Sequence, residues 1–197
     1  MARPRKTDPA LLAEEIMNAF WRDGFGHTSI PDLTEATGHL RGSLYAAYKD
    51  KDGMFAVALR RYLEQLRDSI LPKMEGLAGL RFMLNTVVLI TVGDPLRRGC
   101  LLINTIPELA SLDDANRTTI AAALEEMQQL IRSKVEEACG ALPVPPDTNA
   151  VARLTSLVFA ASVSIRVLGR AGADRQMLQE IADGAVDAVA NALNLPE

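Results

Sequence analysis

Residues 28–48 read TSIPDLTEATGHLRGSLYAAY, a stretch that predicts two short helices joined by a tight turn. Thr28 or Ser29 can cap the first helix, and with Ser29 as the cap Asp32 takes the third helical position of a capping box. Gly38 is expected to end this helix. Two short helices that meet at a glycine-containing corner are typical of a helix-turn-helix, whose second helix enters the major groove of DNA.

The second helix, expected over 41–48, has an apolar side and a polar side. Leu44 and Tyr48 recur at helical spacing and are expected to pack against neighbouring helices. The other side carries Arg41, Gly42, Ser43 and Tyr45. Arginine can bind a guanine edge with two hydrogen bonds, glycine lets the backbone come close, and hydroxyl groups can donate to phosphates. This pattern favours DNA reading, although many helix pairs turn at a glycine.

Helical periodicity dominates the rest of the chain, and no segment shows the sustained alternation of a strand. Asp8 can cap a first helix that begins at Pro9 and ends at Gly24. Asp50 can cap a fourth helix that stops at Pro72. Further helices are expected near 77–92, 98–111, 113–139, 149–169 and 174–194.

The predicted fold is therefore all-α, with about nine helices. Residues 1–50 are expected to form a three-helix, helix-turn-helix DNA-binding domain, and residues 51–197 a helical regulatory domain for ligand binding and dimerisation. A chain of 197 residues is long enough to bury a substantial core. The clearest break between helices is segment 140–147, which contains three prolines.

Composition fits an ordinary globular protein, with 48% hydrophobic and 23% charged residues. The net charge is −4, and residues 1–51 carry equal numbers of acidic and basic side chains, so attraction to phosphate must come from local placement. We expect no secretory signal and no membrane span. Cys100 and Cys139 are too few and too far apart for a zinc motif or a disulfide framework, which favours a cytoplasmic protein.

The last two helices predict a dimer, because the first of them is apolar on much of its circumference and needs cover on more than one side. A twofold four-helix bundle is the simplest cover, and helices interior to a monomer are the alternative. A second apolar stripe on the same helix comprises Leu157, Ala160, Ser164 and Val167. The residues assigned to the dimer interface are Val151, Leu154, Val158, Ala161, Ile165, Leu168, Ala182, Ala185 and Val189.

The motif TSIPDLTEATG, followed by RGSLY at 41–45, Tyr48 and Lys51, closely resembles the tetracycline-repressor (TetR) family of transcriptional regulators. The resemblance is strong over about residues 8–60. Beyond them, the helix number, the length and the segment RGCLLINT at 98–105 are similar to the family's variable regulatory domain. The resemblance implies a dimeric repressor whose ligand-binding core moves the two reading heads out of register with the operator.

The resemblance also implies which residues contact DNA. Thr28, Tyr45 and Lys51 would bind phosphates, Lys51 at the positive end of the fourth helix. The full set of implied contacts is Thr28, Ser29, Arg41, Gly42, Ser43, Tyr45 and Lys51.

Three departures from the family pattern leave the operator preference open. Leu40 stands where the family has a capping serine, while Ala46 replaces a frequent histidine and Thr34 a small alanine. The basic residues Arg3, Arg5 and Lys6 could form an arm in the minor groove or an unstructured, solubilising tail.

No catalytic or metal site is expected. His27 and His39 both lie in the DNA-binding head, and neither is spaced from a carboxylate or cysteine as such a site requires. No phosphate-binding glycine motif is present, and no cofactor is expected. Cys100 lies in an apolar run and is expected to pack, with Arg97 and Arg98 as the only hint of an activated thiol.

A cavity for a small molecule is expected between the helices that follow residue 77. Polar residues in apolar helices need partners or a ligand, and this makes Asn104, Ser162 and Arg166 informative. An apolar or weakly polar effector is expected, against the alternative that these residues are ordinary core. The assigned lining is Phe82, Thr86, Ile90, Leu102, Asn104, Thr105, Met127, Ile131, Ser162 and Arg166.

The predicted function is that of a DNA-binding transcriptional regulator, a repressor that a small-molecule effector releases from a palindromic operator. The expected partners are double-stranded operator DNA, the effector and a second copy of the chain, with no membrane. The alternative is a helical small-molecule-binding or interaction module that has lost DNA reading, which the net acidity and the missing serine cap support.

Overall fold

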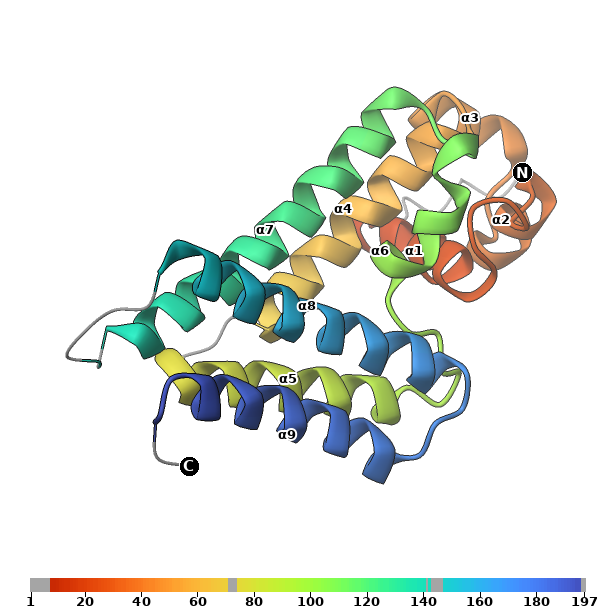
Figure 1. The fold of residues 1–197 in the computed structure, drawn as a ribbon. Helices are drawn as coiled ribbons and strands as arrows, with labels where there is room; N and C mark the ends of the chain where they lie inside the picture. Colours follow the sequence, from red (N-terminus) through yellow and green to blue (C-terminus); the bar gives the residue numbers. More distant parts are fainter. Residues whose placement is uncertain (1–7, 71–73, 141, 143–146, 196–197) are drawn as a thin grey trace.

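The computed structural model describes residues 8–70, 74–140, 142 and 147–195. Within them the chain forms nine α-helices and one short 3-10 helix, with no strand, which confirms the all-α prediction. Figure 1 shows a small helical head joined to a larger bundle by the long helix α4. Arg3, Arg5 and Lys6 lie outside the described residues, so their role stays a prediction.

The head consists of α1 (Pro9–Asp23), α2 (Ile30–Thr37) and α3 (Arg41–Tyr48). The Asp8 side chain accepts a hydrogen bond from the Ala10 amide at 2.9 Å and so caps α1. Its expected bounds are confirmed because the cap, the proline at the first position and the terminal glycine are all local signals.

The expected capping box opens α2. The Ser29 hydroxyl accepts from the Asp32 amide at 3.3 Å, and the Asp32 carboxylate accepts from the Ser29 amide at 2.7 Å. Gly38 ends the helix with a φ of 65°, a left-handed conformation that glycine adopts without strain. The corner between α2 and α3 is thus fixed by local chemistry.

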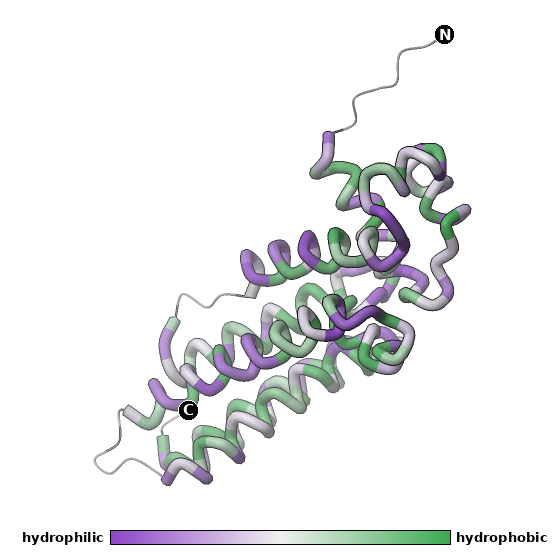
Figure 2. The backbone as a smooth tube through the Cα atoms, turned by 90° about the horizontal axis from the view of Figure 1, so that it is seen from above, coloured by the Kyte–Doolittle hydropathy of each residue, from purple (hydrophilic) through white to green (hydrophobic). Residues whose placement is uncertain are grey.

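The bundle is built from α4 (Lys51–Ile70), α5 (Gly76–Gly93), α7 (Asp114–Cys139), α8 (Thr148–Arg170) and α9 (Arg175–Ala192). Figure 1 shows α4 beside α7, and α5 packed with α8 and α9. Figure 2 shows apolar and hydrophilic segments alternating along the helices, as expected of helices with one buried side.

The segment expected as one helix over 98–111 is broken. It forms the short α6 (Leu101–Thr105) and then the 3-10 helix η1 (Ile106–Ser111). Pro107 accounts for the break, because it has no amide N–H and its ring clashes with the carbonyl four residues earlier. Figure 1 places α6 between the head and the bundle.

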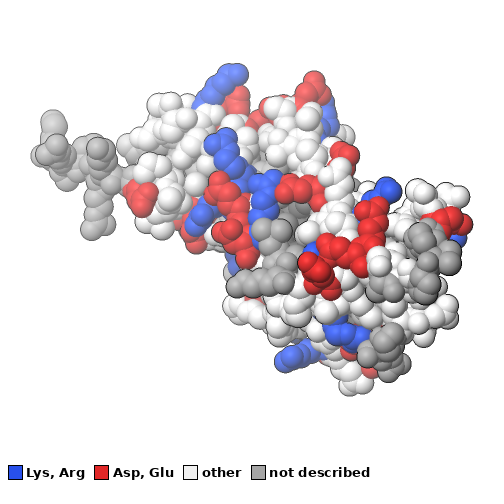
Figure 3. Space-filling model, turned by 90° about the vertical axis from the view of Figure 1, so that its left-hand side faces the viewer, with Lys and Arg blue, Asp and Glu red and all other residues white. Residues whose placement is uncertain are grey.

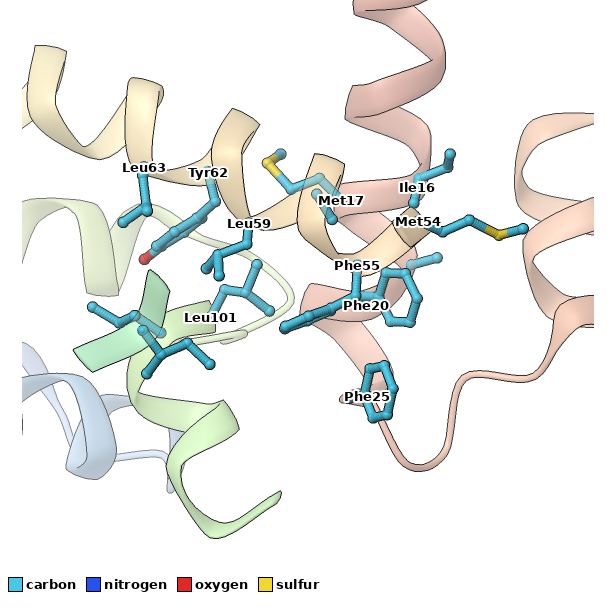
Figure 4. Packing of buried hydrophobic residues seen from close by; sticks show 14 of the residues in the cluster. Ile16, Met17, Phe20, Phe25, Met54, Phe55, Leu59, Tyr62, Leu63 and Leu101 are labelled. Atoms are coloured by element: carbon cyan, nitrogen blue, oxygen red, sulfur yellow. The ribbon is translucent and has the colours of Figure 1, made fainter. Parts of the chain in front are cut away.

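One continuous core cluster runs from the head into α4, α6 and α7. Its aromatic centre is Phe55, fully buried, whose ring meets those of Phe20 and Phe25 edge-on with 5.2 Å between centroids in each pair. Figure 4 shows these three rings gathered where α1 meets α4, with Tyr62 and Leu101 farther along the same cluster. The cluster therefore crosses residue 50, where the division into two domains was expected, and that division stays a prediction.

A close approach fixes α5 against α8. A Cβ atom built on Gly169 of α8 would lie 2.0 Å from the Cγ2 atom of Thr91 in α5, so any larger residue would force the Thr91 side chain to move. By length and composition α5 and α8 could each cross a membrane, which qualifies the expectation that no segment could do so. Their packing against each other, α7 and α9 accounts for their apolar content.

The assignment of the dimer interface is wrong for most of its residues. Within α8 and α9 the following side chains are buried in the chain's own core, so they are not available to a partner: Val151, Val158, Ala161, Ile165, Ala182, Ala185 and Val189. Leu154 is half-buried and Leu168 is 37% exposed.

The second apolar stripe of α8 faces outward instead, with Leu157 43% and Val167 48% exposed. Both stripes have helical spacing, and periodicity alone does not tell which one the chain itself covers.

Candidate DNA-binding surface and effector cavity

Helix α3 presents an open polar side, as its sequence predicts. Arg41, Gly42 and Ser43 are exposed, while Leu44 is fully buried in the core of the head. The guanidinium carbon of Arg41 lies 5.2 Å from the centroid of the Tyr45 ring. The buried position of Leu44 and the exposure of the first three residues of α3 are thus confirmed, whereas Tyr45 and Tyr48 are both half-buried. The DNA contacts assigned to α3 stay predictions.

Leu40 marks the start of α3 and is 79% exposed. It occupies the N-cap position with no side-chain hydrogen bond to the helix, which agrees with the missing capping serine. Its methyl groups therefore stand in solvent at the start of α3.

The structure corrects the role assigned to Thr28. Its side chain is fully buried, and its hydroxyl donates to the Gly24 carbonyl at 2.6 Å, so this side chain is not available to a phosphate. Thr28 instead closes the turn between α1 and α2. Ser29 is exposed, but its hydroxyl is engaged with Asp32 in the capping box.

Lys51 at the start of α4 is only half-exposed, because its ammonium group lies 4.4 Å from the centroid of the Phe25 ring. Burial lowers the pKa of this ammonium group, and the nearby Glu108 carboxylate opposes the shift. Its expected phosphate contact stays a prediction, and the lysine also covers the aromatic core of the head.

Glu108 of η1 holds the turn between α1 and α2. Its carboxylate accepts hydrogen bonds from the amides of Phe25 at 2.8 Å and Gly26 at 3.1 Å. A Cβ atom on Gly24 or Gly26 would lie 3.2 or 3.1 Å from this carboxylate, so the turn leaves little room for side chains. Two charge-assisted bonds thus tie η1 to the head.

A second link joins α1 to the loop that precedes α6. The guanidinium carbon of Arg98 lies 4.0 Å from the Trp21 ring centroid, and Arg98 donates to Asn18 at 2.8 Å. The Trp21 indole N–H donates to the Gly99 carbonyl at 3.1 Å. Burial raises the pKa of Asp94, but its hydrogen bonds and attraction to Arg98 outweigh this effect, so the pKa lies below its usual value.

The same loop is bound to α8 and α6. The Arg98 carbonyl accepts hydrogen bonds from Arg170 and from Asn104, both at 2.7 Å. Gly99 has a φ of 69° and lies against the Arg166 carbonyl, 3.2 Å from where a Cβ would be. Residues 94–100 thus form a junction between the head and the bundle, and we call this segment the junction loop.

A cavity of about 290 Å³ lies between α4 and α7. The paired side chains of Arg67 and Glu126 stand beside it, with two hydrogen bonds of 2.8 and 2.6 Å. The lining residues are Leu63, Leu66, Arg67, Ala123, Glu126, Met127, Gln129 and Leu130. Of the residues assigned to a ligand cavity, Met127 is the one in this lining.

The other assigned lining residues lie elsewhere. Ile90 is 40% exposed on α5, which contradicts its placement in an enclosed cavity. Leu102 and Ile131 are fully buried core residues, and Phe82 is half-buried on α5. The hydroxyls of Thr86, Thr105 and Ser162 each donate to a backbone carbonyl of their own helix, so these side chains have partners without a ligand.

Cys100 is a buried free thiol at the start of α6. Arg98, the suggested activator, is engaged with Asp94, Asn18 and Trp21, and Arg97 is exposed. Among the described residues no group of three or more His, Cys, Asp or Glu side chains could hold a metal ion. Figure 3 shows acidic and basic side chains intermixed on one face of the molecule, in keeping with the small net charge.

Comparison with known proteins places this geometry in context. Residues 76–185 match the family model described as "Tetracyclin repressor-like, C-terminal domain". The chain is 27% identical over 189 residues to the HTH-type transcriptional repressor ComR of Escherichia coli, covering 91% of this chain and 88% of that protein. It is 25% identical over 194 residues to the uncharacterized HTH-type transcriptional regulator YezE of Bacillus subtilis, covering 93% and 96%.

A solved structure gives a further match. It is a cysteine-substituted form of the TetR family transcriptional regulator CifR in complex with 26-bp operator DNA. The TM-score is 0.80 and the sequence identity 27%, over 94% of this chain and 99% of that chain.

Proposed function

Because the chain belongs to the TetR family of DNA-binding transcriptional regulators, we propose that it is a cytoplasmic homodimer that represses transcription from a twofold-symmetric operator. A small-molecule effector releases it from this DNA. The observation that carries the proposal is the open polar side of α3, which sits on a fully buried Leu44 and is free to enter a groove.

The dimer forms through the outward stripes of α8 and α9. Leu157 and Val167 of α8 and Met177 of α9 are each more than 40% exposed, although all three are large and apolar. Exposed Ala160 and Gly184 let a partner helix come close. A twofold axis through this surface makes a four-helix interface and sets the spacing between two α3 helices.

Each head reads one half-site from the start of α3. Arg41 provides a fork of donors for a guanine, and Gly42 allows the close approach. The exposed methyl groups of Leu40 suit the 5-methyl group of a thymine, so the substitution that weakens the helix cap also supplies an apolar reading group.

The effector acts through the two links between bundle and head. The junction loop bonds to α1 through Trp21 and to α8 through Arg170, and Glu108 grips the turn before α2. An effector that shifts α6 or α8 is therefore expected to move the head as a rigid body. The effector can change DNA binding only if it binds more tightly to the arrangement of the heads that does not fit the operator than to the arrangement that does.

Replacing Arg41 with alanine is expected to weaken operator binding by about 1–3 kcal/mol and to relax the preference at one base pair. The reason is that alanine leaves one base edge without its two donors. Fluorescence anisotropy with an operator selected from a random DNA pool, and with single-base variants of it, measures both effects.

Two further variants give this measurement its controls. Lys51→Ala is expected to weaken binding to all sequences alike and to flatten the salt dependence, since a phosphate contact carries no sequence information. Arg132→Ala removes an exposed arginine from α7, away from the head, and is expected to leave binding unchanged. Equal operator affinity of Arg41→Ala and the unmodified protein contradicts the assignment of Arg41 as a base reader.

Glu108→Gln is expected to destabilise the protein by about 1–2 kcal/mol. Glutamine keeps one acceptor but presents an NH₂ group to the second amide, so one of the two bonds to the turn is lost. Hydrogen exchange at the amides of Phe25 and Gly26 should accelerate, which mass spectrometry can follow. Glu125→Gln on the exposed side of α7 is the matched control, and unchanged exchange at the turn in both variants would disprove the link.

A further inference from the structure

The cavity between α4 and α7 lies where the two hydrophobic clusters of the chain meet. The first cluster contains the core of the head and continues through α4, α6 and the first part of α7. The second contains residues of α5, α8, α9 and the last part of α7. In the cavity wall Leu63 and Ala123 belong to the first cluster, whereas Leu130 packs against the second. Leu66 packs against both, so the wall is drawn from both clusters.

The lining of the cavity leaves no charge unpaired among its described residues. Arg67 and Glu126 are its two charged residues, and they bind each other with hydrogen bonds of 2.8 and 2.6 Å. Hydrogen bonding to Arg67 lowers the pKa of Glu126, so the carboxylate stays ionised and paired. The buried Arg166, which the sequence assigns to a ligand cavity, is not in this lining and donates to the Ser162 carbonyl at 2.8 Å. A charged ligand would therefore lose water without gaining a free partner.

The rest of the lining favours an aliphatic ligand. Apart from Arg67, Glu126 and Gln129, the described lining residues have aliphatic side chains. Leu66 and Leu130 are only half-buried, so a ligand between them would remove further apolar surface from water. The volume of about 290 Å³ lies at the lower end of the range typical of ligand pockets, which suits a small molecule.

We propose that the effector is a neutral aliphatic molecule that fills this cavity and joins the two clusters. This inference rests on the proposed function, because it gives the effector a chemical class and a site. Helix α4 carries Phe55 in the core of the head and Leu66 in the cavity wall. A molecule packed between Leu66 and Leu130 therefore fixes α4, and with it the head, relative to α7. Because α6 belongs to the first cluster, the same movement reaches the junction loop.

A series of straight-chain alcohols from 1-butanol to 1-decanol probes the cavity, with hexanoate and octanoate as charged analogues. Calorimetry with the full-length protein is expected to show affinity rising about fourfold for each added methylene until the cavity is full. Each carboxylate is expected to bind at least about tenfold more weakly than the alcohol with the same number of carbons, because an unpaired charge is costly to bury. Bound alcohol should release operator DNA, which fluorescence anisotropy measures.

Two substitutions change the cavity in opposite directions. Ala123→Phe fills it and is expected to weaken the binding of 1-octanol at least about tenfold. Met127→Ala enlarges it, so affinity should continue to rise to longer alcohols than in the unmodified protein. Ala122→Phe places the same ring on the exposed side of α7 and is the matched control, with binding unchanged. If Ala123→Phe does not fold, the chain-length profile of Met127→Ala still tests the site.

The outcomes separate this inference from the function on which it rests. If the unmodified protein binds operator but no alcohol, or binds octanoate more tightly than 1-octanol, the neutral effector is disproved and the regulator stands. Alcohol binding that neither Ala123→Phe nor Met127→Ala alters would disprove the site, and binding without release of operator would disprove the coupling through α4. If no DNA selected from a random pool is bound with sequence preference, the proposed function itself fails, whereas calorimetry still measures binding to the cavity.

Discussion

A Leu157→Glu variant is expected to elute as a monomer and to bind operator DNA at least about 100-fold more weakly than the unmodified protein. Leu157 lies on the outward stripe of α8 and is 43% exposed in the single chain. A twofold interface brings two copies of this stripe together, and two glutamates there would have to be buried side by side. Once the dimer separates, each head binds its half-site alone. The additional affinity that comes from binding both half-sites at once is then lost.

Light scattering measures the mass, and anisotropy with full-length and half-site operators measures the affinity. Leu89→Glu is the matched control, because Leu89 is a similarly exposed leucine (52%) on α5, outside the α8 and α9 stripes. It should remain a dimer with unchanged affinity. A dimeric Leu157→Glu variant with full operator affinity would exclude the α8 and α9 face as the interface.

Phe55→Ala is expected to lower the free energy of unfolding by about 3–5 kcal/mol. The ring is fully buried and meets both Phe20 and Phe25 at 5.2 Å, so alanine leaves a cavity at the point where α1 meets α4. Domains of this size are stable by only about 5–15 kcal/mol, so a large share of the stability is lost. Urea unfolding followed by circular dichroism measures the change.

Phe55→Leu provides the comparison, since it fills much of the same volume without the aromatic contacts. It should cost clearly less than alanine. Operator binding by Phe55→Ala should fall at temperatures well below those that affect the leucine variant, because the rings support the base of the head. An alanine variant that loses less than about 1 kcal/mol would show that this cluster does not anchor the head.

The sequence alone predicts the head closely because its signals are local. Asp8, the Ser29 and Asp32 box, and Gly38 each act on residues within one turn, so their effects can be read along the chain. The polar side of α3 follows from helical spacing in the same way. Pro107 is also a local signal, but the apolar pattern continues past it, and this pattern wrongly predicts one unbroken helix.

The contacts that join head and bundle had no such signal. Glu108 binds amides 82 and 83 residues away, and Trp21 binds a carbonyl 78 residues away. A single glutamate, tryptophan or arginine within a helical pattern does not indicate which residue, tens of positions away in the sequence, its side chain will contact. The two apolar stripes of α8 were likewise equivalent in sequence, and only tertiary packing shows which one the chain covers.

The contact between Gly169 and Thr91 has a mechanical consequence. The Thr91 methyl group fills the space beside Gly169, so α5 and α8 cannot slide along each other unless that side chain moves. We therefore expect α5 and α8 to move together, and any relative motion to occur in short elements such as α6 and η1. Gly169→Ala is expected to push α5 and α8 apart. Such a variant would change the response to an effector without altering any residue of α3.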